Sequence, residues 1–264
     1  MRKIKKGIVW LIIVCLLMVE NMVFMAETVE TRTNDLTTGS CGQNLVWEID
    51  ENGVLTISGT GEMYDYLHHS GWDEWNPELV KEVIVKQGVT NIGGGAFEDC
   101  VNLVKVSLQG RIKSIDYYAF QGCINLETIE TGTALLRIGK AAFSGCTNLK
   151  KITWPNCVEK IEYSAFSDCI NLEVTDFPDS LKVIDDYAFK NCEKLDVVNL
   201  PEGCESVGNN AFSWCTNLVE LKLPNSITDV GREVCYDCEN LERVSLSESM
   251  WCIPTAGFLN CVIL

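Results

Sequence analysis

Histidine is nearly absent from this chain of 264 residues, and no Lys/Arg-rich run follows its first six residues. The two histidines are the neighbours His68 and His69, which excludes most histidine-based catalytic and metal sites. With 21 basic and 37 acidic residues the formal net charge is −16, and so acidic a surface repels phosphate backbones. No G-x-S-x-G, Walker A, H-E-x-x-H or G-x-G-x-x-G context occurs. We therefore expect no nucleic-acid partner, no cofactor, no metal and no enzyme of those classes.

The segment 1–26 has the pattern of a secretory signal peptide. A basic start, residues 1–6, precedes an unbroken apolar run, residues 8–19. This run is too short for the ~20 residues that a membrane-spanning helix needs. Cleavage after Ala26 fits the pattern, and an uncleaved anchor is the alternative that the same flanks leave open. In either case we expect an exported chain without further membrane contact, in which residues 27–40 form a flexible lead-in.

Cysteine, by contrast, is abundant, and its spacing reveals a repeat. Eight of the 14 cysteines recur every 23 residues, and a leucine follows each of them three residues later. This cysteine column consists of Cys100, Cys123, Cys146, Cys169, Cys192, Cys215, Cys238 and Cys261. The full unit reads L-x-x-V-x-L-P-x-x-V-x-x-I-x-x-x-A-F-x-x-C-x-N, and eight copies run from Val80 to Leu264. A strict period of this length predicts a solenoid of eight coils.

The apolar spacing within the unit predicts its local structure. V-x-L alternates as in a short strand, which Pro155, Pro178, Pro201 and Pro224 would end. V-x-x-I is expected to turn the chain back, and A-F-x-x-C has the one-turn spacing of a short helix. No single unit can enclose its own apolar side chains, so the coils must stack and like residues form columns. We therefore predict an α/β solenoid, a superhelix with a parallel β-sheet and short helical turns over residues 80–264.

Residues 41–79 are predicted to form a small β-rich cap ahead of the coils. Two alternating apolar segments, 45–49 and 54–58, flank the turn signal Asp-Glu-Asn-Gly at 50–53. Such a cap would cover the exposed apolar edge of the first coil.

The repeat resembles that of bacterial BspA-like leucine-rich-repeat proteins. The resemblance rests on L-x-x-V-x-L-P and I-x-x-x-A-F-x-x-C over residues 80–264, and residues 41–75 resemble the leader that often precedes such arrays. The commoner leucine-rich consensus has Asn or Cys three positions after its third Leu, where this chain has Arg111, Ala134, Cys157 or Ser180. The family implies an exported or surface-displayed solenoid that binds proteins, with adhesion and host contact as the proposed roles.

The cysteine column could be a disulfide framework or a set of buried thiols. Neighbouring coils would place the Cα atoms about 5 Å apart, which is inside the disulfide range. Stacked equivalents point the same way, however, and each cysteine is expected to face the core, where a free thiol acts as a small hydrophobic group. We therefore predict reduced, buried thiols, despite an export signal that favours bridges.

Other reactive residues have simpler structural explanations. Cys235-x-x-Cys238 resembles a redox or half-zinc motif, but Cys238 belongs to the column and Cys235 replaces the repeated Phe. A nucleophilic or metal site could be drawn from Cys41, His68, Asp73 and Glu74, for which an exposed polar loop is the alternative. Three more cysteines lie off the column and receive no role: Cys157, Cys204 and Cys252.

Two further columns are expected to be structural. The repeated phenylalanines could be imagined as a ligand-stacking stripe, but they occupy the same inward position in every coil and are predicted to be core. They are Phe97, Phe120, Phe143, Phe166, Phe189, Phe212 and Phe258. The Asn that precedes most of the leucines is expected to bond backbone groups at the turn into the strand.

The candidate binding surface is the outward face of the predicted strands. The second, third and fifth positions of each strand give 24 side chains, of which six are basic and eight acidic, a net charge of −2. Such a mixed, rigid sheet suits a protein partner better than a polyanion, although strand propensity alone could explain its Thr and Val residues. The predicted site residues are Lys105, Glu127, Glu130, Lys150, Lys151, Glu173, Asp176, Asp196, Glu220 and Lys222.

The function predicted from the sequence is a secreted or cell-surface protein-binding module, with adhesion or partner interaction as its role. The alternatives are an accessory part of an exported enzyme with activity in the cap, and a truncated structural repeat fragment. The last coil is also expected to offer an uncapped edge for self-association.

Overall fold

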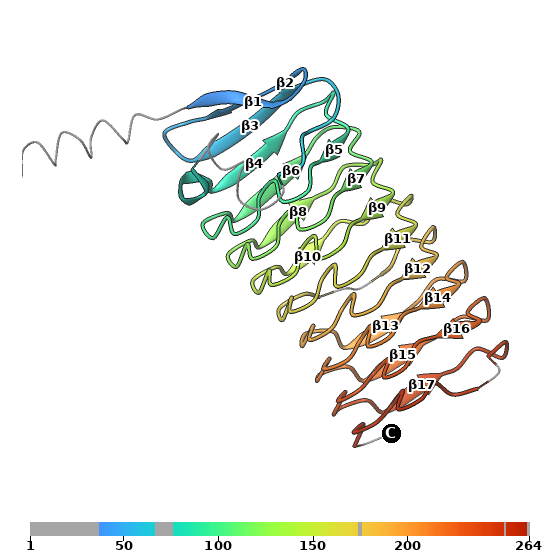
Figure 1. The fold of residues 1–264 in the computed structure, drawn as a ribbon. Helices are drawn as coiled ribbons and strands as arrows, with labels where there is room; N and C mark the ends of the chain where they lie inside the picture. Colours follow the sequence, from blue (N-terminus) through green and yellow to red (C-terminus); the bar gives the residue numbers. More distant parts are fainter. Residues whose placement is uncertain (1–36, 67–75, 174–175, 251, 263–264) are drawn as a thin grey trace, which may run out of the picture. The chain divides into compact units, whose positions relative to one another are not determined.

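The computed structural model describes residues 37–66, 76–173, 176–250 and 252–262. The predicted signal peptide and most of the lead-in lie outside these residues, as do His68, His69, Asp73 and Glu74. From Thr38 onward the chain forms one unit, a β-solenoid of about seven turns that follow one another in a row (Figure 1). In this part of the chain no helix is long and apolar enough to cross a membrane.

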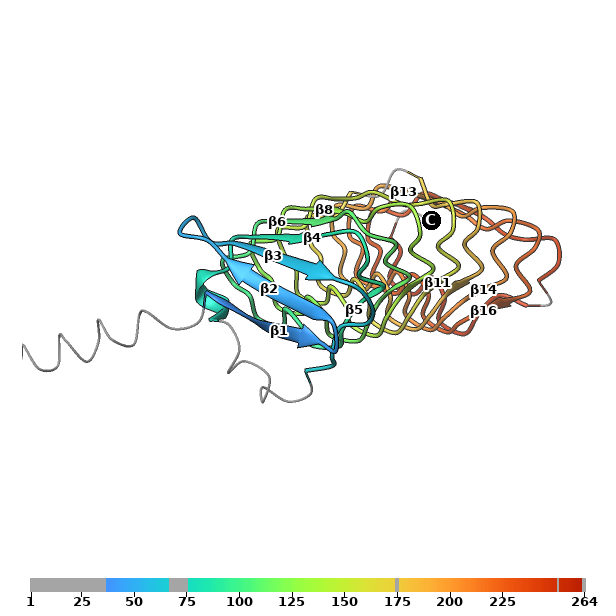
Figure 2. The same ribbon diagram turned by 90° about the horizontal axis from the view of Figure 1, so that it is seen from above.

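The predicted V-x-L strands form a row of parallel strands along one side of the solenoid (Figure 2), here called the first sheet. Strands β4 to β10, and again β13 to β17, pair with their equivalents in the next turn, so that Lys105 lies opposite Thr128 and Val106 opposite Ile129. Alternation then buries the valine and isoleucine positions. The strands are β4 (Glu82–Val85), β6 (Lys105–Leu108), β8 (Thr128–Glu130), β10 (Lys151–Ile152), β13 (Val197–Asn199), β15 (Glu220–Lys222) and β17 (Arg243–Ser245).

The V-x-x-I segments do more than turn the chain back, because they form a second parallel sheet along another side (Figures 1 and 2). Its strands have only two residues each, of which the second is the buried or half-buried Ile or Val. They are β5 (Asn91–Ile92), β7 (Ser114–Ile115), β9 (Arg137–Ile138), β11 (Lys160–Ile161), β12 (Val183–Ile184), β14 (Ser206–Val207) and β16 (Asp229–Val230). The prediction of a single sheet was therefore incomplete.

The prediction of short helical turns was wrong. Among the described residues the only helical element is the short 3-10 helix η2 (Pro77–Leu79). In every A-F-x-x-C segment the residue before Ala and the residue before Cys have positive φ, as at Tyr118 (58°) and Gly122 (71°). The N–H groups of these two residues and of the Phe donate hydrogen bonds to carbonyl groups of the next turn. The N–H of Phe97, for example, donates to the carbonyl of Ala119 at 2.7 Å. An α-helix would need these donors for its own i−4 carbonyls.

Proline ends the strands as expected, and it also begins the next turn. The carbonyl of Pro178 accepts the N–H of Leu181 at 3.0 Å, and that of Pro201 accepts the N–H of Cys204 at 2.9 Å. The ring supplies a fixed φ where no ladder donor is needed. The chain thus leaves the first sheet at the same point in successive turns.

At the N-terminal end, three longer strands precede the turns: β1 (Thr38–Gly42), β2 (Leu45–Ile49) and β3 (Val54–Gly59). The predicted hairpin at 50–53 is confirmed, since β2 and β3 pair antiparallel across a turn in which Asp50 Oδ1 accepts the N–H groups of Asn52 and Val54. Strand β3 then pairs parallel with β4, so the hairpin extends the first sheet. Strand β1 begins inside the predicted lead-in, because Thr38 already pairs with Glu48.

The core between the sheets consists of stacked columns, as predicted. Neighbouring Phe rings from Phe97 to Phe212 stack with centroids 5.1–5.6 Å apart and nearly parallel planes. Asparagines before the leucines reach back to a carbonyl of the preceding turn: Asn125 Nδ2 donates to Val101 at 2.8 Å and Asn171 Nδ2 to Thr147 at 2.8 Å. These bonds confirm that the Asn column ties backbone groups together at the turn into the strand.

Candidate functional site

The predicted binding residues do lie on the outward side of the first sheet. Eight of the ten are exposed, and Lys105 and Glu220 are half-buried. Because each strand position recurs in the next turn in register, side chains of neighbouring turns lie beside one another in rows. We call this surface, formed by the second, third and fifth strand positions, the first-sheet face.

Ion pairs, most of them between adjacent turns, join charges of this face near its two ends. Near its N-terminal end, Lys105 Nζ lies 3.5 Å from Glu82 and 3.9 Å from Glu130, and Lys150 Nζ lies 2.9 Å from Glu127. Near its C-terminal end, Glu220 accepts Lys222 at 3.3 Å and Arg243 at 3.5 Å. Glu220 is therefore only 19% exposed, whereas the other partners are more open to solvent.

The two groups of ion pairs are separated at the turn that holds Glu173 and Asp176, two of the predicted site residues. Among the described residues, which do not include 174 and 175, hydrogen-bonded pairing of first-sheet strands runs to β10 and resumes at β13. Glu173 still joins the preceding turn, since its N–H donates to the carbonyl of Lys150 at 2.9 Å. Lys151, Glu173 and Asp176 form no ion pair with any described residue, so these charges are available to a partner.

Two further observations describe this face. Ser107 points outward but is buried, because Glu130 of the next turn covers it and accepts its hydroxyl at 3.2 Å. The balance of charge is also not restricted to this face. The outward positions of the second sheet hold four basic and six acidic residues, which gives the same net charge of −2. These are Lys113, Arg137, Lys160 and Lys182 with Asp116, Glu159, Glu162, Asp185, Glu205 and Asp229.

The cysteine column is buried from Cys100 to Cys238, as predicted, whereas Cys261 in the last turn is only half-buried, and all these thiols are free. No disulfide joins any of the thirteen cysteines in the described part of the chain. Each column thiol from Cys123 onward donates to the carbonyl of the column Phe, or of Cys235 in its place, in the preceding turn, as Cys169 does to Phe143 at 3.1 Å. Burial raises the pKa of Cys169 well above its usual range. Cysteine therefore serves this position as a small hydrophobic group with one donor.

The Cys235-x-x-Cys238 pair follows the structural interpretation. The N–H of Cys235 donates to Gly257 in the next turn, as the column Phe residues do in theirs. The hydrogen bond that the Cys235 thiol donates to Cys238, together with burial, raises the pKa of Cys235 well above its usual range, which opposes formation of a reactive thiolate. No group of three or more His, Cys, Asp or Glu side chains among the described residues could hold a metal ion.

One off-column cysteine does have a regular place that was not predicted. Cys204 is buried at the position that Val158 and Leu181 occupy in the two preceding turns. Burial raises its pKa to about 11. The signal was present in the repeat, where V of V-x-x-I is replaced here by Cys.

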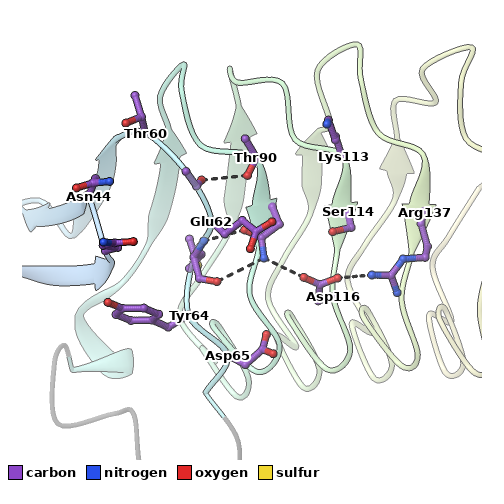
Figure 3. Close-up of a pocket in the computed structure, with 14 residues that line it drawn as sticks. Asn44, Thr60, Glu62, Tyr64, Asp65, Thr90, Lys113, Ser114, Asp116 and Arg137 are labelled. Atoms are coloured by element: carbon purple, nitrogen blue, oxygen red, sulfur yellow. Dashed lines mark hydrogen bonds and ion pairs between the residues drawn. The ribbon is translucent and has the colours of Figure 1, made fainter.

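A polar groove near the N-terminal end was not predicted either. Its volume is about 850 Å³, and residues 60–65, which follow β3 and which we call the strap, form one wall (Figure 3). The side chains of β5, β7 and β9, with Asp116, form the floor and the opposite wall. Lining side chains include Tyr64, Asn91, Lys113, Ser114, Asp116 and Arg137.

The fold and repeat define a leucine-rich β-solenoid, and the sequence comparison identifies its family. The profile of the BspA type leucine rich repeat region matches residues 76–196 and 136–264, with six copies. The chain belongs to this family. No curated protein matches the chain.

Solved structures of bacterial leucine-rich repeat proteins resemble the chain. The leucine rich repeat protein of T. pallidum is 29% identical, with a TM-score of 0.58 over 74% of this chain and 86% of that one. A leucine-rich repeat protein from Bacteroides ovatus is 23% identical, with a TM-score of 0.56 over 84% of this chain and 69% of that one. A leucine rich cell surface protein from Faecalibacterium prausnitzii is 19% identical, with a lower TM-score of 0.45 over 84% of this chain and 80% of that one.

Proposed function

We propose that this chain is an exported or surface-displayed module that binds an extracellular protein through its first-sheet face. The observation that carries the proposal is the face itself: exposed side chains of both signs held in register on parallel strands. Protein surfaces carry both signs too, so a partner can be matched charge by charge. Membership in a leucine-rich-repeat family, whose members generally mediate protein interactions, supports binding rather than catalysis.

The centre of the proposed surface is the open area around Lys150 and Lys151. Lys151 is free of ion pairs with the described residues, and Thr128 and Thr153 on the neighbouring positions are exposed and small. A partner can therefore approach the backbone closely there. Glu220 contributes less in this proposal, because Lys222 and Arg243 already occupy its carboxylate.

The remaining parts of the proposal concern the ends of the array. We propose eight coils from Val80 onward, with residues 41–79 as the cap, an adhesive role, and export directed by residues 1–26. Pairing of β3 with β4 supports the cap, since it places a strand on the edge of the first coil. Self-association through the last coil stays a prediction, which sedimentation velocity over a range of concentrations would test: a clean monomer at high concentration would contradict it.

The experiment compares matched double charge reversals on the two sheets. Purified extracellular proteins are passed over the immobilised chain in a surface-plasmon-resonance experiment, and any binder is measured against Lys150→Glu with Lys151→Glu and against Lys160→Glu with Lys182→Glu. The first pair should weaken binding about tenfold or more, largely through slower association at low salt, and the second pair by less than about twofold. Equal effects of the two pairs would place the binding surface elsewhere.

A further inference from the structure

The polar groove beside the strap is separate from the first-sheet face, because it lies over the N-terminal end of the second sheet (Figure 3). Its volume of about 850 Å³ lies within the range of about 300–1,000 Å³ that is typical of small-molecule sites. The strap is the wall that makes this end hollow, and only strands β5, β7 and β9 of the second sheet contribute to the lining.

Backbone hydrogen bonds fix the strap against the edge strand β5. The N–H of Gly61 donates to Gly88 and its carbonyl accepts the N–H of Thr90, both at 3.0 Å. Further along, the Asn91 amide bonds Met63 as a second peptide group would: its Oδ1 accepts the N–H of Met63 at 2.7 Å, and its Nδ2 donates to the carbonyl of Met63 at 3.4 Å. The strap is therefore held in place by regular hydrogen bonds of the fold.

The floor of the groove is a preorganised polar network. Asn91 Nδ2 donates to Asp116 Oδ2 at 3.0 Å, and the other carboxylate oxygen of Asp116 accepts Arg137. Arg137 also pairs with Glu162 at 3.3 Å, so its guanidinium is held from two sides while 41% of the side chain stays open to solvent. Asp65 is fixed as well, since it accepts the N–H of Gly94 at 2.7 Å. Fixed donors and acceptors of this kind cost little further ordering when a ligand binds.

The chemistry of the lining selects the class of ligand. Apolar ligands need apolar walls, and this groove is lined mostly by amides, hydroxyls and charged groups. Two bases, Lys113 and Arg137, face three acids, Glu62, Asp65 and Asp116, in a chain of net charge −16, so an anion is not favoured. A cation would have to compete with Arg137 for Asp116. A ligand with many uncharged donors and acceptors satisfies these groups without displacing them.

An aromatic ring stands at the side of this polar surface. Tyr64 lines the groove and is 51% exposed, and Figure 3 shows its ring extending from the strap on the side away from Asp116 and Arg137. Its backbone is fixed by a hydrogen bond from its N–H to Cys41 at 2.8 Å. An exposed aromatic face in the lining of the same groove as these polar groups fits a ring whose faces are C–H and whose edges are hydroxyl groups. We propose that this groove binds a neutral, hydroxyl-rich chain, namely an uncharged oligosaccharide.

The repeat supplies a matched control for the test. Ser114 lines the groove, and Ser206 occupies the same strand position four turns later, on β14, outside the groove. Both are half-buried. Ser114→Trp therefore fills the groove, whereas Ser206→Trp imposes the same change on the same sheet elsewhere. Tyr64→Ala removes the aromatic face without filling anything, and Tyr163→Ala removes another exposed tyrosine as its control.

The full chain and these variants are screened against immobilised neutral hexasaccharides of glucose, mannose, galactose, xylose and N-acetylglucosamine, with a sulfated hexasaccharide as the polyanionic arm. We expect saturable binding of at least one neutral sugar, weakened about tenfold or more by Ser114→Trp and by Tyr64→Ala, and changed less than about twofold by the two controls. Circular dichroism checks that each variant is folded. Absence of binding to every neutral sugar, binding of the sulfated sugar alone, or equal loss in Ser114→Trp and Ser206→Trp would each overturn the proposal.

Discussion

The two parallel sheets are built from the same repeat and carry the same net charge, yet they present different surfaces. First-sheet strands have up to four residues, and their exposed face continues along the array. Second-sheet strands have two residues each, and at β5 to β9 the strap walls them into a groove. The longer strands of the first sheet leave that side open to a large partner. The strap lets the other side enclose a small ligand, and the difference does not depend on net charge.

The ion pairs of the two sheets also differ in how far solvent reaches them. On the first sheet Lys150 and Glu127 pair while about half of each side chain stays exposed. On the second sheet the side chain of Asp116 is only 14% exposed, and its carboxylate accepts hydrogen bonds from Arg137 and Asn91. Exposed pairs contribute little to stability, whereas a covered carboxylate that loses its partner is costly.

The largest expected effect is a loss of stability at alkaline pH, which tests whether both sheets share the core that contains the cysteine column. Burial raises the pKa of the column thiols, as at Cys146 and Cys192, so the folded chain keeps protons that the unfolded chain releases above its thiol pKa of about 8.5. Stability should be unaffected by these thiols below that pH. Above it, the free energy of unfolding should fall by up to about 1.4 kcal/mol per thiol per pH unit.

Urea unfolding under reducing conditions at neutral and alkaline pH would measure this slope. Replacing Cys146 and Cys192 by Ala should reduce it by the contribution of two thiols, and labelling of the native chain should stay low at the column and rise on denaturation. An unchanged slope in the double variant would contradict a contribution from the column.

The next effect in size concerns the Phe column. Phe166→Ala should reduce the free energy of unfolding by about 3–5 kcal/mol, because it opens a cavity between Phe143 and Phe189 in the middle of the stack. Tyr163→Ala, an exposed aromatic of the same turn, is the control and should cost below about 1 kcal/mol. Similar losses in both variants would mean that the stack is not the core that the two sheets share.

The smallest expected effect compares the loss of an ion pair on each of the two sheets. Arg137→Ala should destabilise by about 1–2 kcal/mol, since Asp116 is left covered with fewer donors, whereas Lys150→Ala should cost below about 0.5 kcal/mol. Thermal unfolding at low and high salt would measure both, with the Lys150 effect reduced further by salt. Equal values would show that the covering of Asp116 has no energetic consequence.

The sequence predicted the columns, the first-sheet strands and the hairpin, because each depends on apolar spacing that the fold must bury. It did not predict the second sheet, since two-residue strands such as β7 and β9 contain only one buried residue each and show no alternation. The helical turns were a wrong choice between two structures with the same Phe-to-Cys spacing. The residues before the cysteines offered a signal: they are mostly Gly, Asn or Asp, which favour positive φ, as Gly145 and Asn191 show.

The candidate sites divide in the same way. The first-sheet face could be derived from strand alternation, although not its ion pairs or the covering of Ser107 by Glu130. The groove could not be derived, because its wall and floor come from segments far apart in the chain, which meet through bonds such as those of the Asn91 side chain with the strap backbone. No repeat position distinguishes Asn91 in advance.

The inter-turn hydrogen bonds of the A-F-x-x-C segments give the molecule an electrical axis. Three peptide groups per turn, such as that between Ala119 and Phe120, accept from the preceding turn and donate to the following one. Their dipoles of about 3.5 D therefore add along the stack, whereas those within a β-strand alternate and largely cancel. The positive end points towards the C-terminal turns. The backbone alone thus makes the two ends of an otherwise repetitive, acidic molecule electrostatically unlike.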